Sequence, residues 1–192
     1  MAESPAPEVF TRAVQAMHAV APRAEISIDP VPGPRRIAPW STAVVAEVAE
    51  PGGDGAELAT GRFVLLHDPE GHDGWSGTFR AVTFLRARVE GDLGREALLE
   101  DVAWSWLTEA LAPSVGGDVD PLRLAATITR VLSQGYGALA DQPPTVDLEV
   151  RASWSPEPEE IGAHLEAWTG VLATAAGLPP VGDDVLRFRR RS

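Results

Sequence analysis

The sequence predicts an α+β fold, an antiparallel sheet of about five to six strands with three helices packed on it. Several segments alternate apolar and polar residues, which is typical of strands with one buried and one solvated face and therefore of antiparallel sheets. Three other segments repeat apolar residues at spacings of three and four, as amphipathic helices do. The predicted order is one helix, three or four strands, a helix, two strands and a helix.

Residues 96–111 form the helix around which this prediction is organised. Pro113 ends its pattern, because proline disfavours helical backbone at the preceding residue. Trp104 lies off the apolar stripe at about 100° per residue. We interpret Trp104 as a residue at the shoulder of the helix, covered by a loop or a second helix, and keep an exposed anchor for a partner as the alternative. The predicted stripe consists of Leu98, Leu99, Val102, Ala103, Trp106, Leu107 and Ala110.

The other elements follow in chain order. The first helix begins at Pro7 and runs through Ala21. The last helix is capped by Ser155 and ends at Gly177, which two prolines follow. Residues 30–34, with three prolines, are expected to be an irregular connector. Strands are expected around residues 26–28, 41–50, 58–66, 78–90 and 145–154. Residues 123–133 are interpreted as a strand from their Thr, Ile and Val content, with a helix as the alternative.

Composition restricts the class of protein. We expect residues 1–182 to form one α+β domain and residues 183–192 a basic, disordered tail. The net charge of −12 disfavours nucleic acid and anionic membranes as partners and favours a basic one. The chain has no cysteine, which excludes disulfides and thiolate sites. Its start does not resemble a signal peptide and no run is long enough to span a bilayer, so we expect a cytoplasmic protein.

The most polar connector, residues 67–75, is the first candidate site. Imidazole and carboxylate groups at this density could bind a divalent metal, but its Asp-Pro and Asp-Gly steps are ordinary turn chemistry. We therefore expect no metal there and interpret the loop as a recognition surface. The candidates in it are His67, Asp68, His72, Asp73 and Trp75.

A second candidate is the arginine-rich strand at residues 78–90. Arg80, Arg86 and Arg88 alternate onto the same face as Val82 and Phe84. We favour a ladder of ion pairs with acidic residues on neighbouring strands over a groove for an anionic ligand or partner. The acidic residues considered are Glu47, Asp147 and Glu149.

No catalytic motif is present. Residues 74–77 lack the spacing of a nucleophile elbow, and residues 135–137 lack the third glycine of a dinucleotide fingerprint. Tyr136 is interpreted as a packed residue with a satisfied hydroxyl, with ligand contact as the alternative. We predict no catalytic residue and no cofactor.

The last helix has a second, small-residue face. We expect this face to allow close packing, within the domain or across a homodimer, with a solvated surface as the alternative. Gly162 also suggests such packing. The face consists of Ala163, Ala167, Gly170 and Thr174.

Six phrases together resemble an uncharacterised actinobacterial family known as domain of unknown function 3000. They are GRFVLLHDPEG at 61–71, GTFRAVTFLRA at 77–87, VAWSWLTEAL at 102–111, TRVLSQGYGALAD at 129–141, EVRASWSP at 149–156 and HLEAWTGVLATAAGLPP at 164–180. The resemblance implies a single domain and supplies no reaction or cofactor.

The element order is also similar to that of the small acidic dimeric chaperones of type III secretion. We therefore expect a non-enzymatic cytoplasmic binding or adaptor protein with a protein partner, and a homodimer stays open. The alternative is a small enzyme or small-ligand-binding protein that uses residues 67–75 with nearby arginines.

Overall fold

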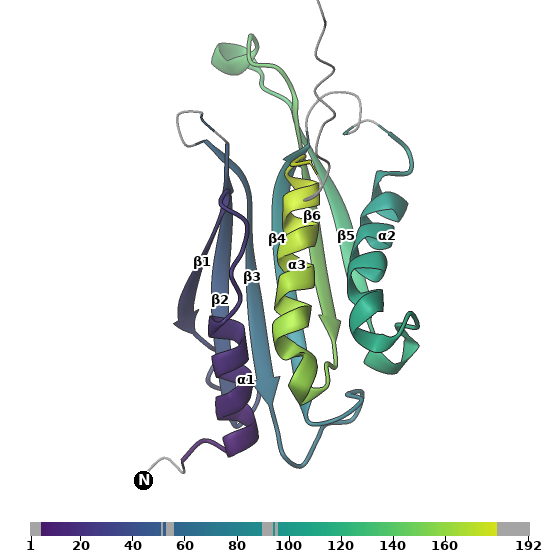
Figure 1. Ribbon diagram of the computed structural model, residues 1–192. Coiled ribbons are helices and arrows are strands. Elements are labelled where there is room, and N and C mark those ends of the chain that lie inside the picture. Colours follow the sequence, from purple (N-terminus) through teal and green to yellow (C-terminus); the bar gives the residue numbers. More distant parts are fainter. Residues whose placement is uncertain (1–4, 51, 53–55, 90–93, 95, 180–192) are drawn as a thin grey trace, which may run out of the picture.

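The computed structural model describes residues 5–50, 52, 56–89, 94 and 96–179. Over these residues it contains a six-stranded antiparallel sheet, in the order β1-β2-β3-β4-β6-β5, with three α-helices on one of its faces (Figure 1). The α+β prediction is confirmed. The predicted tail, residues 183–192, lies outside the described residues. The helices are α1 (Glu8–His18), α2 (Leu99–Leu111) and α3 (Ile161–Ala175). The strands are β1 (Ile26–Pro32), β2 (Trp40–Ala49), β3 (Glu57–His67), β4 (Phe79–Val89), β5 (Ala125–Ser133) and β6 (Thr145–Trp154).

The core lies between the sheet and α3, which runs along the strands over the middle of the sheet (Figure 1). The ring of Trp168 packs edge-on against Phe63 at 5.7 Å between centroids, and Trp154 approaches the same ring at 5.9 Å. Gly61 of β3 lies directly under Trp168, because a Cβ at this position would come within 2.6 Å of the indole. Close approach of α3 to the sheet therefore requires glycine at position 61.

The apolar stripe of α2 differs from the predicted one. The fully buried residues repeat at a spacing of four, whereas Leu98 is 63% exposed and Trp106 is only half-buried. Figure 1 shows the reason: α2 lies at the side of the helix layer, beside β5, and packs on one helix neighbour, α3. A helix at the edge of a layer buries a narrower stripe than one in its centre. The buried residues are Leu99, Ala103, Leu107 and Leu111.

The expected connector at residues 30–34 is wrong, because Pro30 and Pro32 belong to edge strand β1. The Ile26 N–H donates to Arg23 O in the preceding turn rather than to β2. Every second residue along β1 therefore directs its N–H away from β2, and the two prolines occupy such positions. A missing N–H at these positions costs no hydrogen bond in the sheet, which is why an edge strand tolerates proline.

The first and the last helix, α1 and α3, begin or end at other residues than expected. The first helix ends at His18 rather than at Ala21. Before α3 the chain forms a short 3-10 turn, Pro158–Glu160, and the N-terminus of α3 has no side-chain cap. Ser155 lies at the end of β6 instead, where its hydroxyl makes other contacts. The end at Gly177, with its positive φ of 76°, is as predicted.

The two glycines within α3 meet different surroundings. Gly162 faces α1, since a Cβ there would approach the Ala16 carbonyl oxygen at 3.4 Å. A Cβ on Gly170 would meet nothing within 4 Å. Within the described residues, close packing is therefore found at Gly162 and not at Gly170.

Candidate functional site

The face of the sheet opposite the helices is here called the open face. Along β4, the buried residues alternate with residues whose side chains point away from the core, and these include Val82, which is 39% exposed. Figure 1 shows α1, α2 and α3 together on the other side. The residues that β4 contributes to the open face are Arg80, Val82, Phe84, Arg86 and Arg88.

One register row crosses all six strands of the open face without a charge, and we call it the uncharged band. Its members are direct cross-strand partners, so their side chains lie next to one another. The next row carries Arg62 on β3, Phe84 on β4 and Arg151 on β6. The uncharged band is therefore an apolar strip with cationic groups beside it. From β1 to β5 the band consists of Val31, Ala43, Val64, Val82, Ser153 and Ala125.

The expected ladder of ion pairs is present on part of this face. Arg86 meets Asp147 at 2.8 Å, and this hydrogen bond raises the pKa of the arginine. Arg151 meets Glu149 at 2.7 Å, and its guanidinium lies 5.2 Å from the ring centroid of Phe84. These arginines are held in place by carboxylates of the same strand or the adjacent one.

Arg80 is held differently, without a carboxylate. Its guanidinium donates to Ser153 Oγ at 2.7 Å, to Ser155 Oγ at 3.2 Å and to Arg123 O at 3.2 Å. Burial, and next the nearby charge of Arg123, lower the pKa of Arg80. Ser155 Oγ also accepts the N–H of Ser76 at 3.0 Å, which ties the loop between β3 and β4 to the end of β6.

A hollow of about 280 Å³ lies beside these groups, open to solvent over β4, β6 and β5. Val82 and Ala125 supply apolar lining, and the hydroxyls of Ser153 and Thr127 and the guanidinium of Arg151 supply polar groups. Arg80 and the three residues that it binds, Ser153, Ser155 and Arg123, are called the Arg80 cluster. Because Ser153 both lines the hollow and binds Arg80, the hollow and the Arg80 cluster are continuous.

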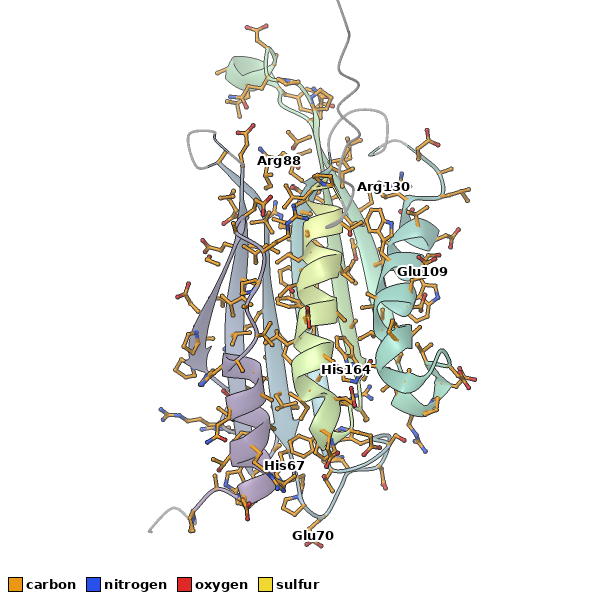
Figure 2. All side chains as sticks on the ribbon, viewed as in Figure 1. His67, Glu70, Arg88, Glu109, Arg130 and His164 are labelled. Carbon is orange, nitrogen blue, oxygen red and sulfur yellow. The ribbon has the colours of Figure 1, made fainter. Side chains whose placement is uncertain are left out.

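The structure separates the residues of the predicted loop site. His67 is 2% exposed and stacks between Phe10 and Phe79, with ring centroids 5.9 and 4.2 Å away. Its Nδ1 lies 3.0 Å from Thr78 O, and burial lowers the pKa of the imidazole. His67 is therefore a core residue at the end of β3 (Figure 2) and not part of a binding surface. Asp68 is a turn former, since its Oδ1 accepts the N–H of Glu70 at 3.0 Å.

The rest of that loop is at the surface. The ring of His72 lies against Trp75 in a tilted arrangement, with 5.5 Å between centroids, and Asp73 is exposed next to them. Among the described residues, no three His, Asp or Glu side chains come together as a set that could hold a metal ion. Through Ser76 this loop reaches the Arg80 cluster, so the structure brings the predicted loop and one predicted arginine together.

Trp104 and Tyr136 lie elsewhere. Trp104 is 39% exposed on the outer side of α2, so the predicted cover over it is absent from the described residues. The interpretation of Tyr136 as a packed residue is wrong, because the side chain is 80% exposed. It belongs to the connection between β5 and β6, which extends past the end of the sheet (Figure 1).

The sequence interpretation missed Ser153, Ser155 and Arg123. Alternation along β6 does place Ser153 on the same face as Arg151, and this signal was available. Ser155 was interpreted as a helix cap. Arg123 has a left-handed backbone, φ 47°, which no residue pattern indicated.

A second histidine, His164, lies in the core as well. This histidine of α3 is fully buried, and burial lowers the pKa of its imidazole to about 4. Its Nδ1 lies 3.5 Å from Ser114 Oγ.

Comparison with known proteins agrees with the resemblance found in the sequence. Among the described residues, no helix combines the length and hydropathy needed to cross a membrane. Neither the curated proteins nor the solved structures contain a significant match to this chain. A family model described as "Protein of unknown function (DUF3000)" matches residues 6–185, so the chain belongs to this family.

Proposed function

We propose that this chain is a non-enzymatic cytoplasmic binding protein that holds an acidic, partly apolar segment of a partner protein on the open face. The observation that carries the proposal is the uncharged band, which crosses six strands between arginines and is covered by none of the helices that the structure describes. A sheet face of this kind is ordinarily covered, by a second layer or by a partner, because burying its apolar side chains is favourable.

The charge of the open face supports an acidic partner. Over the whole chain, 28 acidic residues outnumber 16 basic ones, yet on the open face the arginines are not outnumbered. Among the described residues, Arg62, Arg80 and Arg88 form no ion pair. These unneutralised cations lie on both sides of the band. The arginines of the face are Arg62, Arg80, Arg86, Arg88 and Arg151, and its acids are Asp29, Glu47, Glu57, Asp147 and Glu149.

This local charge changes the expectation drawn from composition. The net charge of −12 favours a basic partner, but binding depends on the surface that is contacted. A second copy of the same acidic chain is repelled at long range, whereas a short acidic segment meets mainly the arginines. Apolar side chains of the segment would lie on Val64 and Val82, and its carboxylates would reach Arg62 and Arg80.

Selection from a displayed library of random peptides tests the proposal. We expect the full-length protein to enrich peptides that combine apolar residues with Asp and Glu, and their binding to weaken with added salt. The substitution Val82→Glu places a carboxylate in the middle of the band and is expected to abolish this binding.

Trp104→Glu is the matched control, because Trp104 and Val82 are both 39% exposed but lie on opposite sides of the molecule. Binding should survive this change. Enrichment of basic peptides, or binding that Val82→Glu leaves intact, would show that the open face is not the docking surface. Thermal melts of both variants confirm that they fold.

A second candidate function is the binding of a small ligand, and the hollow of about 280 Å³ beside Arg80 favours it. A pocket of this size is at the lower limit for small-molecule sites. Failure of the peptide selection, together with a small molecule that protects β4 and β6 from hydrogen exchange, would favour this function instead.

A further inference from the structure

The Arg80 cluster presents hydrogen-bond donors with no acceptor to receive them. Ser153 Oγ and Ser155 Oγ both act as acceptors toward Arg80, so each hydroxyl keeps its own hydrogen for another group. Among the described residues, neither hydroxyl hydrogen has an acceptor and neither Arg80 nor Arg123 has a carboxylate at ion-pair distance.

The two arginines are placed close together by the backbone. The carbonyl oxygen of Arg123 accepts a hydrogen bond from Arg80, which places the backbone of Arg123 beside the Arg80 guanidinium. Arg123 is the one non-glycine residue with positive φ in the described chain. The peptide before it is held by two hydrogen bonds, from Arg123 N to Asp120 O and from Ser155 N to Leu122 O. The charge of Arg123 lies near enough to contribute, after burial, to the lowered pKa of Arg80, and repulsion between like charges is relieved by an anion.

From this geometry we infer that Arg80, Arg123, Ser153 and Ser155 form a binding site for a phosphate-class oxyanion. Two guanidinium groups and two hydroxyl groups supply donors from β4, from β6 and from the turn before β5, which suits an anion with four oxygens better than a carboxylate with two. The hollow next to Ser153 leaves room for an organic group carried by the phosphate. Burial, and next the charge of Arg123, lower the pKa of Arg80, and a bound anion relieves the repulsion between the two charges. The site goes beyond the proposed function, because it needs no partner protein.

Nuclear magnetic resonance of the isotope-labelled full chain tests the site. Inorganic phosphate is added at constant ionic strength, with sodium chloride as the balance, since phosphate also stabilises proteins without binding to a site. We expect saturable shifts at the Ser76 amide and at the Arg80 side chain. A parallel titration with phenyl phosphate separates the two sources: tighter binding indicates a monoester whose organic group fills the hollow, and equal binding indicates the free anion.

Three variants decide whether the shifts report this site. Arg80→Gln and Arg123→Gln are each expected to weaken the affinity at least about tenfold, because each removes a charged donor. Arg88→Gln is the matched control, an arginine on the same strand and face with no ion pair among the described residues, at the end of the sheet opposite His67 (Figure 2). Arg123 is exposed, so its variant stays informative even if Arg80→Gln unfolds. Shifts that do not saturate, or affinities equal in all three variants, would overturn the site.

Discussion

The two faces of the sheet are built from alternate residues of the same strands but have different tasks. On the covered face, Gly61, Phe63 and Trp168 fit so closely that one added methyl group would collide with an indole. On the open face, Phe84 and Val82 stay partly in contact with water, and arginines surround them. Stability therefore comes mainly from the covered face, and the open face is the one to which we assign the proposed binding.

The strongest test of this division compares one aromatic residue from each face. Trp168→Ala removes a fully buried ring and is expected to lower the free energy of unfolding by about 3–5 kcal/mol. Phe84→Ala removes a half-buried ring and is expected to cost only about 1 kcal/mol. Urea unfolding of both variants measures the difference. Equal losses would show that the open face carries as much of the core as the covered one.

Lowering the pH should destabilise the fold through a residue buried on the covered side of the sheet. The buried imidazole of His164 has a pKa near 4, below the ordinary value of 6.5, so the unfolded chain binds a proton at a higher pH than the folded chain. The contribution of the neutral His164 to the free energy of unfolding is fully present above pH 6.5 and is lost as the pH falls toward 4. The total loss is on the order of 3 kcal/mol. The buried His67, whose pKa is also lowered, acts in the same direction.

Unfolding measured from pH 7 to pH 4 should therefore show stability falling with pH in wild type and falling less in His164→Leu. Parallel curves for the two proteins would contradict the role given to this histidine.

Two glycines provide the smallest and most local comparison. Gly61→Ala forces a Cβ against Trp168 and is expected to cost about 1–3 kcal/mol. Gly170→Ala adds a methyl group to open space on the outer side of α3 and is expected to stabilise the protein by up to about 1 kcal/mol. Melting curves distinguish the signs. A loss at Gly170 that depends on protein concentration would instead indicate that a second copy packs on this helix.

Periodicity was sufficient for most of the fold. Alternation predicted β6 at its observed bounds and the face of β4 that carries the arginines, because a strand in a half-covered sheet must alternate. The stripe of α2 was not predicted, since its width depends on how many neighbours the helix has. The number of neighbours cannot be deduced from the apolar residues that recur at helical spacing in the sequence.

The candidate site was predictable only in part, for a similar reason. Arg80 and Arg86 look alike in sequence, on one strand and one face. Arg86 lies within reach of Asp147 on β6, whereas Arg80 lies beyond the paired region of β6 and meets Ser155. The role of Ser155 depends on contacts with residues 75 and 79 positions earlier in the chain. Such partners are brought together by the register of the sheet, which no local pattern encodes.

The prolines of β1 have a consequence for how sheets of this protein can join. Strand addition at that edge needs backbone N–H donors pointing outward, and Pro30 and Pro32 remove two of them. The other edge, β5, has no proline and pairs with β6 alone among the described strands. Two copies can therefore join only β5 to β5, and the pair then ends in a blocked strand on each side. Edge-to-edge growth stops at two sheets, and a continuous fibre of native molecules cannot form by this route.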